Sequence, residues 1–387
     1  MKKVLNLSIL LILTISLVAT LSSCRGEKIA QNSNKIAYTV SDGGDTISSV
    51  VEIPKKYSGH FITKVGASAY FDKDEMISVI IPSSVNEIGA YAFYDCASLS
   101  SVTMYDHVKL IGERAFAECS SLQEIILPSS VTEIGIGAFE NCTRLTSINI
   151  PDGVTKIGAG AFRGCDSLSS VVLPNTVTEI SPYAFKDCAS LRSVTIGDNV
   201  TEIGESAFEN CASLSAVTIP DGVTGIKERT FAGCESLTTL SLSDLTHLNE
   251  SAFEGCLSLC DLTLPETLKN IGARCFADCD TITDLIIPDS VTAIGEAAFE
   301  GCDELANLAI GDGITYLSKD SFNLCARLKS VVFGSSLISV AKNAFGGCSA
   351  IKKVSFAGSE NEWRSIFFGN GNTSVITAKK EYNYVAE

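Results

Sequence analysis

The sequence predicts a β-rich solenoid in which short coils of about 23 residues stack on one another along a single axis. Three observations support this fold class. A cysteine recurs every 23 residues from Cys96 to Cys234 and, after a slip of one residue, from Cys256 to Cys348. A phenylalanine stands three residues before each of these cysteines. Apolar and small polar residues alternate in a short segment of each repeat, which is typical of a strand with one buried face.

The strand is the first element of each repeat, and the stretch from Leu191 to Cys211 serves as an example. Val194 and Ile196 alternate with Ser193 and Thr195, so the two apolar side chains are expected on the buried face. A turn follows at Gly197. In several other repeats a proline begins this turn and ends the strand, because proline cannot donate to a strand ladder.

The second half of the repeat returns the chain to the core. Val200 and Ile203 are expected to point inward, and Gly204 permits a tight or left-handed backbone. Phe208 is expected to lie inward on a short helical or 3₁₀ turn, and Cys211 closes the coil. One coil cannot bury this apolar surface alone, whereas stacked coils can. Parallel strands at ~4.8 Å spacing then form one sheet on the concave side, with the helical turns on the convex side. About thirteen or fourteen coils give an arc roughly 60–65 Å long.

The first residues of the chain are expected to direct export. Two lysines precede an apolar run from Leu5 to Ala19, which is shorter than a membrane-spanning helix needs. The run leads into Leu21, two serines and Cys24, an order that resembles the bacterial lipobox. In proteins with that motif the cysteine carries lipid, so the resemblance implies a lipoprotein signal peptide over residues 1–23 and lipidation of Cys24. The alternative is an ordinary signal peptide that happens to contain a cysteine.

The repeat as a whole resembles the leucine-rich repeats of the BspA-like, or Treponema-type, family. The shared motif reads Leu-x-x-Val-x-Ile-Pro-x-x-Val-Thr-x-Ile-Gly-x-x-Ala-Phe-x-x-Cys and runs from about Tyr38 to the C-terminus. The resemblance implies a leucine-rich repeat solenoid on a bacterial surface lipoprotein, at the cell surface or outer membrane. Members of that family are described as adhesins for host matrix proteins or other bacteria, so a macromolecular partner is implied here as well.

Atypical coils are expected at both ends of the stack. Phe71 is assigned to the phenylalanine position of the first full coil, where Asp74 replaces the cysteine. Trp363, Ile366 and Phe367 are assigned to a terminal coil that covers the end of the core. The expected organisation is a linker over 24–37, an N-terminal capping coil over 38–75, the solenoid over 76–355 and a C-terminal cap over 356–387.

The cysteines could form disulfides, bind metal, or act as small buried apolar residues. Parallel, in-register side chains point the same way and not toward one another, and no Cys-x-x-Cys pair occurs. Burial is therefore the favoured interpretation. Cys260 and Cys275 lie outside the ladder, and we expect the first to be partly exposed and the second to be buried.

Neither an enzyme nor a cofactor is expected. The chain has three histidines, His60, His107 and His247, which belong to different coils and therefore cannot pair with one cysteine. Aspartates recur in the turns less densely than in calcium-binding β-rolls, so no metal is expected. A net charge of −16 repels phosphate backbones and makes nucleic acid an unsuitable partner.

The outward positions of the strands remain as a candidate binding face. They are mostly small or β-branched and carry few charges, which is also what good strand formers give without any ligand. As a whole they suggest a broad surface for a protein and, as an alternative, a polysaccharide or nutrient. The absence of aromatic residues there counts against sugar. The sequence does not predict the oligomeric state. The candidate residues are Thr103, Asn149, Thr195, Thr218, Ser241 and Thr263.

Overall fold

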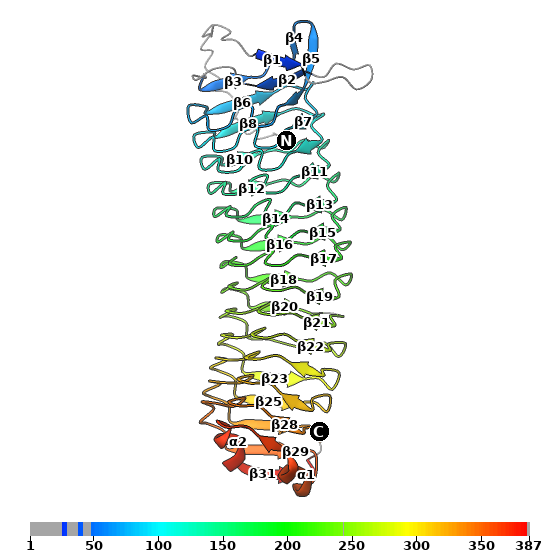
Figure 1. Ribbon diagram of the computed structural model, residues 1–387, viewed down its shortest axis with the longest axis vertical. Helices are drawn as coiled ribbons and strands as arrows, with labels where there is room; N and C mark the ends of the chain where they lie inside the picture. Colours follow the sequence, from blue (N-terminus) through cyan, green and yellow to red (C-terminus); the bar gives the residue numbers. More distant parts are fainter. Residues whose placement is uncertain (1–24, 29–37, 42–47, 243, 385–387) are drawn as a thin grey trace, which may run out of the picture.

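The computed structural model describes residues 25–28, 38–41, 48–242 and 244–384. These residues form a long column of about fourteen coils, each adding one layer along the axis (Figure 1). The signal peptide and Cys24 lie outside the described residues, as does most of the expected linker. No helix among the described residues is long and apolar enough to cross a membrane.

One line of parallel strands runs along the column at the positions that the alternating pattern predicts. The line consists of three sheets, β3 to β12, β14 to β20 and β23 to β31, and within each sheet every strand pairs with the next in parallel, as when Ser78 lies opposite Ser101. The strands are β3 (Val50–Glu52), β6 (Ser78–Ile81), β8 (Ser101–Met104), β10 (Glu124–Ile125), β12 (Ser147–Ile148), β14 (Ser170–Val172), β16 (Ser193–Thr195), β18 (Ala216–Thr218), β20 (Thr239–Ser241), β23 (Asp284–Ile287), β25 (Asn307–Ile310), β27 (Ser330–Phe333), β29 (Lys353–Phe356) and β31 (Lys379–Tyr382). Between β20 and β23, the coil is joined to its neighbour by a single bridge from Thr239 to Asp261.

A second line of parallel strands, which the sequence did not predict, follows the turn in each coil. Most of its members have two residues and place one side chain inward, as Ile203 shows, and one outward, as Glu202 shows. The strands are β5 (His60–Val65), β7 (Glu87–Ile88), β9 (Leu110–Ile111), β11 (Glu133–Ile134), β13 (Lys156–Ile157), β15 (Glu179–Ile180), β17 (Glu202–Ile203), β19 (Gly225–Ile226), β21 (His247–Leu248), β22 (Asn270–Ile271), β24 (Ala293–Ile294), β26 (Tyr316–Leu317), β28 (Ser339–Val340) and β30 (Phe367–Phe368).

The core is a continuous stack of side chains along the axis. Consecutive phenylalanine rings from Phe93 to Phe345 lie nearly parallel, with centroids 5.1 to 5.6 Å apart. The assignment of Phe71 to this stack is wrong. Tyr70 occupies the position, 5.2 Å from Phe93, while Phe71 is 44% exposed and stacks on Tyr94. The repeat period places residue 70 there, because a ring of either kind fits the stack.

The segment that carries each phenylalanine is a run of turns and not the expected helical or 3₁₀ turn. A left-handed residue lies two positions before and two positions after the ring, as Ser206 and Asn210 do around Phe208. These residues interrupt any helix and turn alternate N–H groups toward the next coil, where the N–H of Phe208 donates to the carbonyl of Thr230. Hydrogen bonds therefore tie the coils together on the turn side as well, and the column runs nearly straight in Figure 1.

Glycine stands four residues before seven of the twelve phenylalanines of the stack, and close approach between coils explains it. An added Cβ at Gly204 would lie 2.4 Å from the backbone nitrogen of Pro182 in the preceding coil. The same holds at Gly158, where the nearest atom is the carbonyl oxygen of Gly135 at 2.6 Å. Neither glycine adopts a left-handed backbone. The requirement at these positions is space, because the coils meet backbone to backbone.

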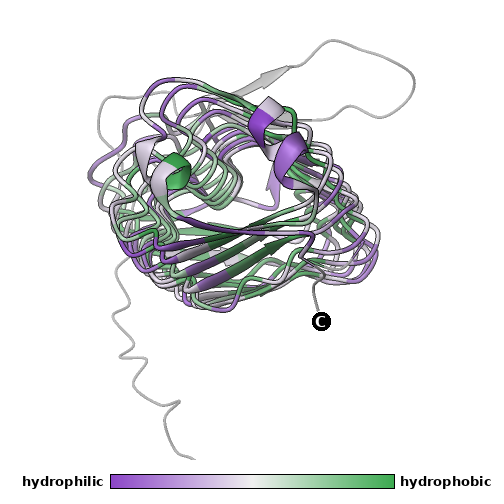
Figure 2. Cartoon of the chain, turned by 90° about the horizontal axis from the view of Figure 1, so that it is seen from below, coloured by the Kyte–Doolittle hydropathy of each residue, from purple (hydrophilic) through white to green (hydrophobic). Residues whose placement is uncertain are grey.

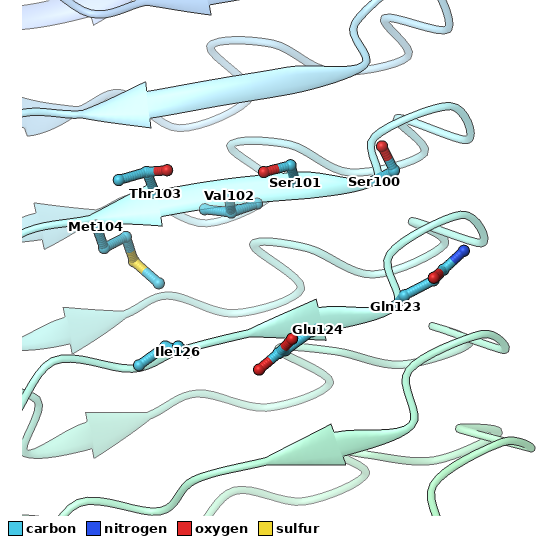
Figure 3. A pocket seen from close by; sticks show the side chains of 8 residues that line it. All are labelled: Ser100, Ser101, Val102, Thr103, Met104, Gln123, Glu124 and Ile126. Carbon is cyan, nitrogen blue, oxygen red and sulfur yellow. The ribbon is translucent and has the colours of Figure 1, made fainter. Parts of the chain in front are cut away.

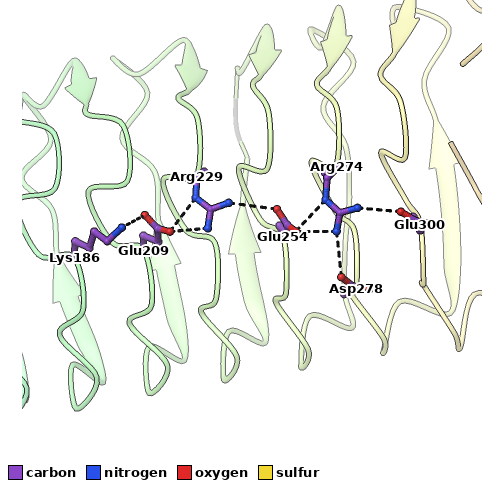
Figure 4. A network of polar contacts seen from close by, with 7 residues as sticks. All are labelled: Lys186, Glu209, Arg229, Glu254, Arg274, Asp278 and Glu300. Carbon is purple, nitrogen blue, oxygen red and sulfur yellow. Dashed lines mark hydrogen bonds and ion pairs between the residues drawn. The ribbon is translucent and has the colours of Figure 1, made fainter. Parts of the chain in front are cut away.

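An ion-pair ladder runs along the turn side of six coils (Figure 4). The carboxylate of Glu209, which is 4% exposed, accepts hydrogen bonds from Lys186 at 2.6 Å and from Arg229 at 2.6 and 2.9 Å. Arg274 continues the series to Glu254 at 2.8 Å and to Glu300 at 3.0 Å. Burial acts to raise the pKa of Glu209, but the hydrogen bonds outweigh it and the net shift is downward.

The C-terminal end is closed by two short helices, α1 (Glu360–Ser365) and α2 (Thr373–Thr377). Figure 2 shows them in a view from this end of the column. Trp363 and Ile366 are buried against the core, as the sequence predicts. Phe367 is 69% exposed, so its assignment to the core is wrong. Its neighbour Phe368 takes that place, 5.3 Å from Trp363, because alternate residues of β30 face opposite sides.

The N-terminal end is closed by a different arrangement of strands. There β1 (Arg25–Lys28) pairs antiparallel with β2 (Tyr38–Ser41), which pairs in parallel with β5. A short strand, β4 (Lys56–Tyr57), folds back on β5 to form a hairpin at this end of the column (Figure 1). The buried core of the described residues begins at Ile53 and ends at Val375, so residues 25–387 contain all of it.

Candidate binding surface

The first line of strands presents a continuous outward surface, which we call the strand face. It consists of the outward residues of β3 to β31 and of the coil between β20 and β23. The inward residues, such as Val217 and Ile219, are 3% and 1% exposed, which fixes the direction of their neighbours because side chains alternate along a strand. The six residues singled out from the sequence all lie exposed on this face: Thr103, Asn149, Thr195, Thr218, Ser241 and Thr263.

Two shallow hollows interrupt the strand face near its N-terminal end. The first has a volume of about 500 Å³ and lies between Thr103, Glu124 and Ile126 of neighbouring coils (Figure 3). The second, of about 670 Å³, is lined by Asn149 and Val172 among others. Two of the six singled-out residues, Thr103 and Asn149, therefore line hollows. Both hollows combine small polar groups with an exposed aliphatic side chain.

Asn149 has a structural function that the sequence did not indicate. Its side-chain carbonyl accepts from the backbone N–H of Leu127 at 2.8 Å, and its amide donates to the carbonyl of Leu127 at 2.7 Å. The side chain thus extends the ladder between β10 and β12, each of which has only two residues. Its amide is occupied by the fold, and Asn149 is consequently less suited to contact a ligand than the threonines are.

The most exposed apolar side chains of the strand face are Ile126, Val172 and Ile286, at 66%, 63% and 70% exposure. They occupy the same strand position as Thr103 and Thr195 in other coils. The six candidate residues chosen from the sequence are all polar, so they do not include these three apolar residues. Their outward position was readable from the strand alternation, and apolar groups held in water at such exposure favour contact with another surface.

Charged groups on the strand face are few, and those near its C-terminal end include several that are paired with neighbours. Asp284 accepts from Asn307 at 2.7 Å, and Asn307 in turn accepts from Ser330 at 2.7 Å. The hydrogen bond from Asn307 lowers the pKa of Asp284. Lys353 forms an ion pair with Glu381 at 2.8 Å. The C-terminal part of the face therefore contains a hydrogen-bonded polar ladder beside the exposed Ile286, whereas Ile126 and Val172 lie in the N-terminal part.

The cysteine ladder is buried packing with a hydrogen-bonding function. The thiol of Cys165 donates to the carbonyl of Phe139, one coil earlier, at 3.2 Å, and the pattern repeats along the stack. Burial raises the pKa of the Cys96 thiol to about 12 and that of the inner thiols further still. Protonated, buried thiols are poor nucleophiles and poor metal ligands. All fourteen cysteines of the described residues are free.

The remaining cysteine, histidine and acidic side chains of the described residues do not come together in one site. Cys260 is exposed and Cys275 is buried, as the sequence predicts. Within the described residues no group of three or more histidine, cysteine and acidic side chains could hold a metal ion. His247 lies in β21, and His60 lies in the hairpin at the far N-terminal end. The strand face is therefore the feature of the described molecule best suited to a function.

A straight stack of parallel coils with an exposed strand face defines a repeat solenoid, a class that presents extended surfaces to its partners. The chain belongs to the family of BspA type leucine-rich repeats. It matches the family's repeat region in six copies, over residues 63–191, 155–283 and 269–387. A search of curated proteins finds no match.

Solved structures agree with this assignment. A leucine-rich repeat protein from Bacteroides ovatus is 25% identical, covers 95% of this chain and 100% of its own, and superposes with a TM-score of 0.70. A leucine-rich cell surface protein from Faecalibacterium prausnitzii is 28% identical over 89% of this chain and 98% of its own, with a TM-score of 0.54. The pneumococcal vaccine antigen PcpA shares the fold at 19% identity, with a TM-score of 0.62 over 94% of this chain and 97% of its own.

Proposed function

We propose that this chain is an exported, non-catalytic bacterial surface protein that is anchored by lipid on Cys24 and binds a protein partner through the strand face. The lipobox-like residues before Cys24 support the anchor, and the family assignment supports a surface location. A similar protein from Faecalibacterium prausnitzii carries the description of a cell surface protein. Adhesion to host or bacterial macromolecules is the function that fits these features together.

The observation that carries the proposal is the composition of the strand face. From β6 to β27 its outward strand positions hold small polar and aliphatic side chains, the acidic residues Glu124, Asp261 and Asp284, and no aromatic residue. Glycan sites commonly stack sugar on aromatic rings, whereas a low-relief face with exposed Ile126, Val172 and Ile286 suits a protein surface. A protein partner is therefore favoured over a polysaccharide or a captured nutrient.

The test is a solid-phase binding assay of residues 25–387 against host matrix proteins, mucins and bacterial surfaces. In the variant Thr195→Arg/Thr218→Arg, two long cations stand in the middle of the strand face. We expect at least roughly tenfold weaker binding, because unpaired charge and bulk oppose close contact. The matched control is Thr155→Arg/Thr224→Arg, which adds the same groups at exposed positions before β13 and β19.

The control variant should bind like the parent chain. Equal loss in both variants would show that charge alone matters, and unchanged binding of Thr195→Arg/Thr218→Arg would remove this part of the strand face from the contact. Background binding to every surface would contradict adhesion itself.

A further inference from the structure

The hairpin of β4 and β5 is a projection at the N-terminal end of the column. Lys56 pairs with Phe61 and Tyr57 with His60, so the loop between the strands has two residues. These residues, Ser58 and Gly59, both have positive φ, at 48° and 83°. Two such residues in a two-residue loop form the turn that best matches the twist of a hairpin. The side chains from residue 55 to residue 61 are exposed.

The hairpin differs in charge from the rest of the molecule. Residues 53–71 contain three lysines and a histidine and no acidic residue, in a chain of net charge −16. Lys64 pairs with Glu87, whereas the ammonium groups of Lys55 and Lys56 lie 6.0 and 4.4 Å from the centre of the Phe61 ring. Phe61 is 48% exposed and so offers an apolar surface beside two cations. An exposed ring flanked by lysines is typical of residues that settle at a lipid headgroup boundary.

The hairpin also lies near the predicted lipid attachment point. Arg25, which follows Cys24 directly, begins β1, and the sheet order is β1, β2, β5. Two strand spacings separate β1 from β5, which is ~10 Å, and the hairpin tip lies on the order of 20 Å from Arg25 along the strands. A membrane that holds Cys24 would therefore be within reach of the hairpin.

We propose that the β4–β5 hairpin docks on a membrane surface rich in anionic phospholipid. The lysines are attracted to the lipid phosphates, and Phe61 enters the headgroup region beside them. Charges are screened over ~8 Å at physiological ionic strength, so the acidic column beyond the hairpin opposes this contact only weakly. The docked hairpin holds the column by a second point besides its anchor, at the N-terminal end of the stack of coils. The proposal goes beyond the proposed function. It uses lipidation of Cys24 only to bring the N-terminal end of the column to the membrane.

The test places a fluorescent reporter on the hairpin. Residues 25–387, carrying Phe61→Trp and an N-terminal histidine tag, are tethered to vesicles through a nickel-chelating lipid, so that native lipidation is not needed. The vesicles contain a spin-labelled quenching lipid in phosphatidylcholine, with or without phosphatidylglycerol. We expect strong quenching of the new tryptophan only when phosphatidylglycerol is present. The natural Trp363 is buried at the opposite end of the column, so the unsubstituted chain supplies the unquenched baseline.

Two charge-reversal variants distinguish specific binding of the hairpin lysines to anionic lipid from mere closeness of the tethered protein to the vesicle. Lys55→Glu/Lys56→Glu should lower the docked fraction roughly tenfold or more, since each lysine near an anionic surface contributes about fivefold. Lys269→Glu/Lys329→Glu makes the same charge change at exposed sites far from the hairpin and should have no effect. A reporter at Ile376→Trp, exposed at the far end, should stay unquenched.

Equal quenching with and without phosphatidylglycerol would overturn the proposal, because the tether alone would then explain it. Absence of quenching on both vesicles would also overturn it and would leave a protein contact as the alternative use of the hairpin. Either result would leave binding by the strand face, measured separately, unaffected.

Discussion

Each cysteine of the ladder places its thiol against the carbonyl oxygen of a ring-bearing residue one coil earlier. Cys165 does so at 3.2 Å from Phe139, and Cys96 at 3.0 Å from Tyr70. A cysteine at this position fills a small space and also satisfies a buried acceptor. Burial was predictable from the period, whereas the hydrogen bond was not, because it depends on the offset between adjacent coils.

The ladder thiols should be inert in the folded chain. We expect one thiol of residues 25–387, Cys260, to react rapidly with a thiol reagent such as dithionitrobenzoate, and the others to react only on unfolding. Burial shields the other thiols from the reagent, and at inner sites such as Cys165 a raised pKa also keeps the thiolate population small. The substitution Cys260→Ser should abolish the fast phase. Rapid reaction of several thiols would contradict the packing described above.

Replacing a ladder cysteine should cost stability in a defined amount. Cys165→Ala loses one thiol hydrogen bond and leaves a small void, and we expect the free energy of unfolding to fall by about 1–2 kcal/mol. Denaturant titration measures this. Cys260→Ala serves as the control and should change it little, since this exposed thiol lies 4.0 Å from its nearest acceptor.

Glu209 gives the ion-pair ladder a characteristic pH dependence. Its pKa is lowered in the folded chain, so its contribution to stability is present above the unfolded pKa of about 4.3 and is lost as the pH falls below it. Glu209→Gln should lower the free energy of unfolding by about 1–3 kcal/mol at neutral pH. The difference from the parent chain should shrink below about pH 4. A difference that is constant with pH in thermal melts would contradict this assignment.

Strand elements show how far the sequence predicts this fold. Val194 and Ile196 alternate clearly enough to place the first line of strands and therefore the strand face. The second line was missed because a strand such as Glu202–Ile203 is too short to show alternation. The expected helical turns around Phe208 were wrong because two left-handed residues, neither of them glycine, interrupt the segment. Composition does not reveal these conformations, which the contacts between coils impose.

Gly204, which stands four residues before Phe208, tests the spacing between coils. Gly204→Ala would place a Cβ 2.4 Å from the backbone of Pro182, so the two coils would have to separate. We expect a loss of about 1–3 kcal/mol in the free energy of unfolding, measured by denaturant titration. Gly225→Ala is a suitable control, because its Cβ would meet its nearest atom, the carbonyl oxygen of His247, at 3.2 Å. An equal loss in the two variants would count against close backbone packing as the cause.

The whole molecule depends on its two ends, since a repeat column otherwise exposes its core at each. Its C-terminal end is closed by Trp363, Ile366 and Phe368, all packed on the last coils. Ending the chain after Ala357 removes this cover and leaves Phe333 and Phe356 open to water. We expect the shortened chain to aggregate, as measured by size-exclusion chromatography with light scattering. A stable monomer of the shortened chain would show that the terminal coil is dispensable.

The strand face is also a property of the whole molecule, because no single coil supplies more than a few outward side chains. The sequence located all six polar candidates on it, but it did not reveal that Asn149 is engaged with Leu127. That pairing depends on the shortness of β10 and β12, which appears only when the coils are stacked. Ile126 and Ile286 complete the surface from the same strand positions.

The most direct test of the account is whether the strand face is displayed outside the cell. Cys260 is exposed immediately before the strand segment at Asp261, so a membrane-impermeant maleimide applied to intact cells reports on this face. We predict labelling of the parent chain on intact cells and none of the Cys260→Ser variant. Labelling that occurs only after the cells are broken would place the strand face inside and contradict surface display.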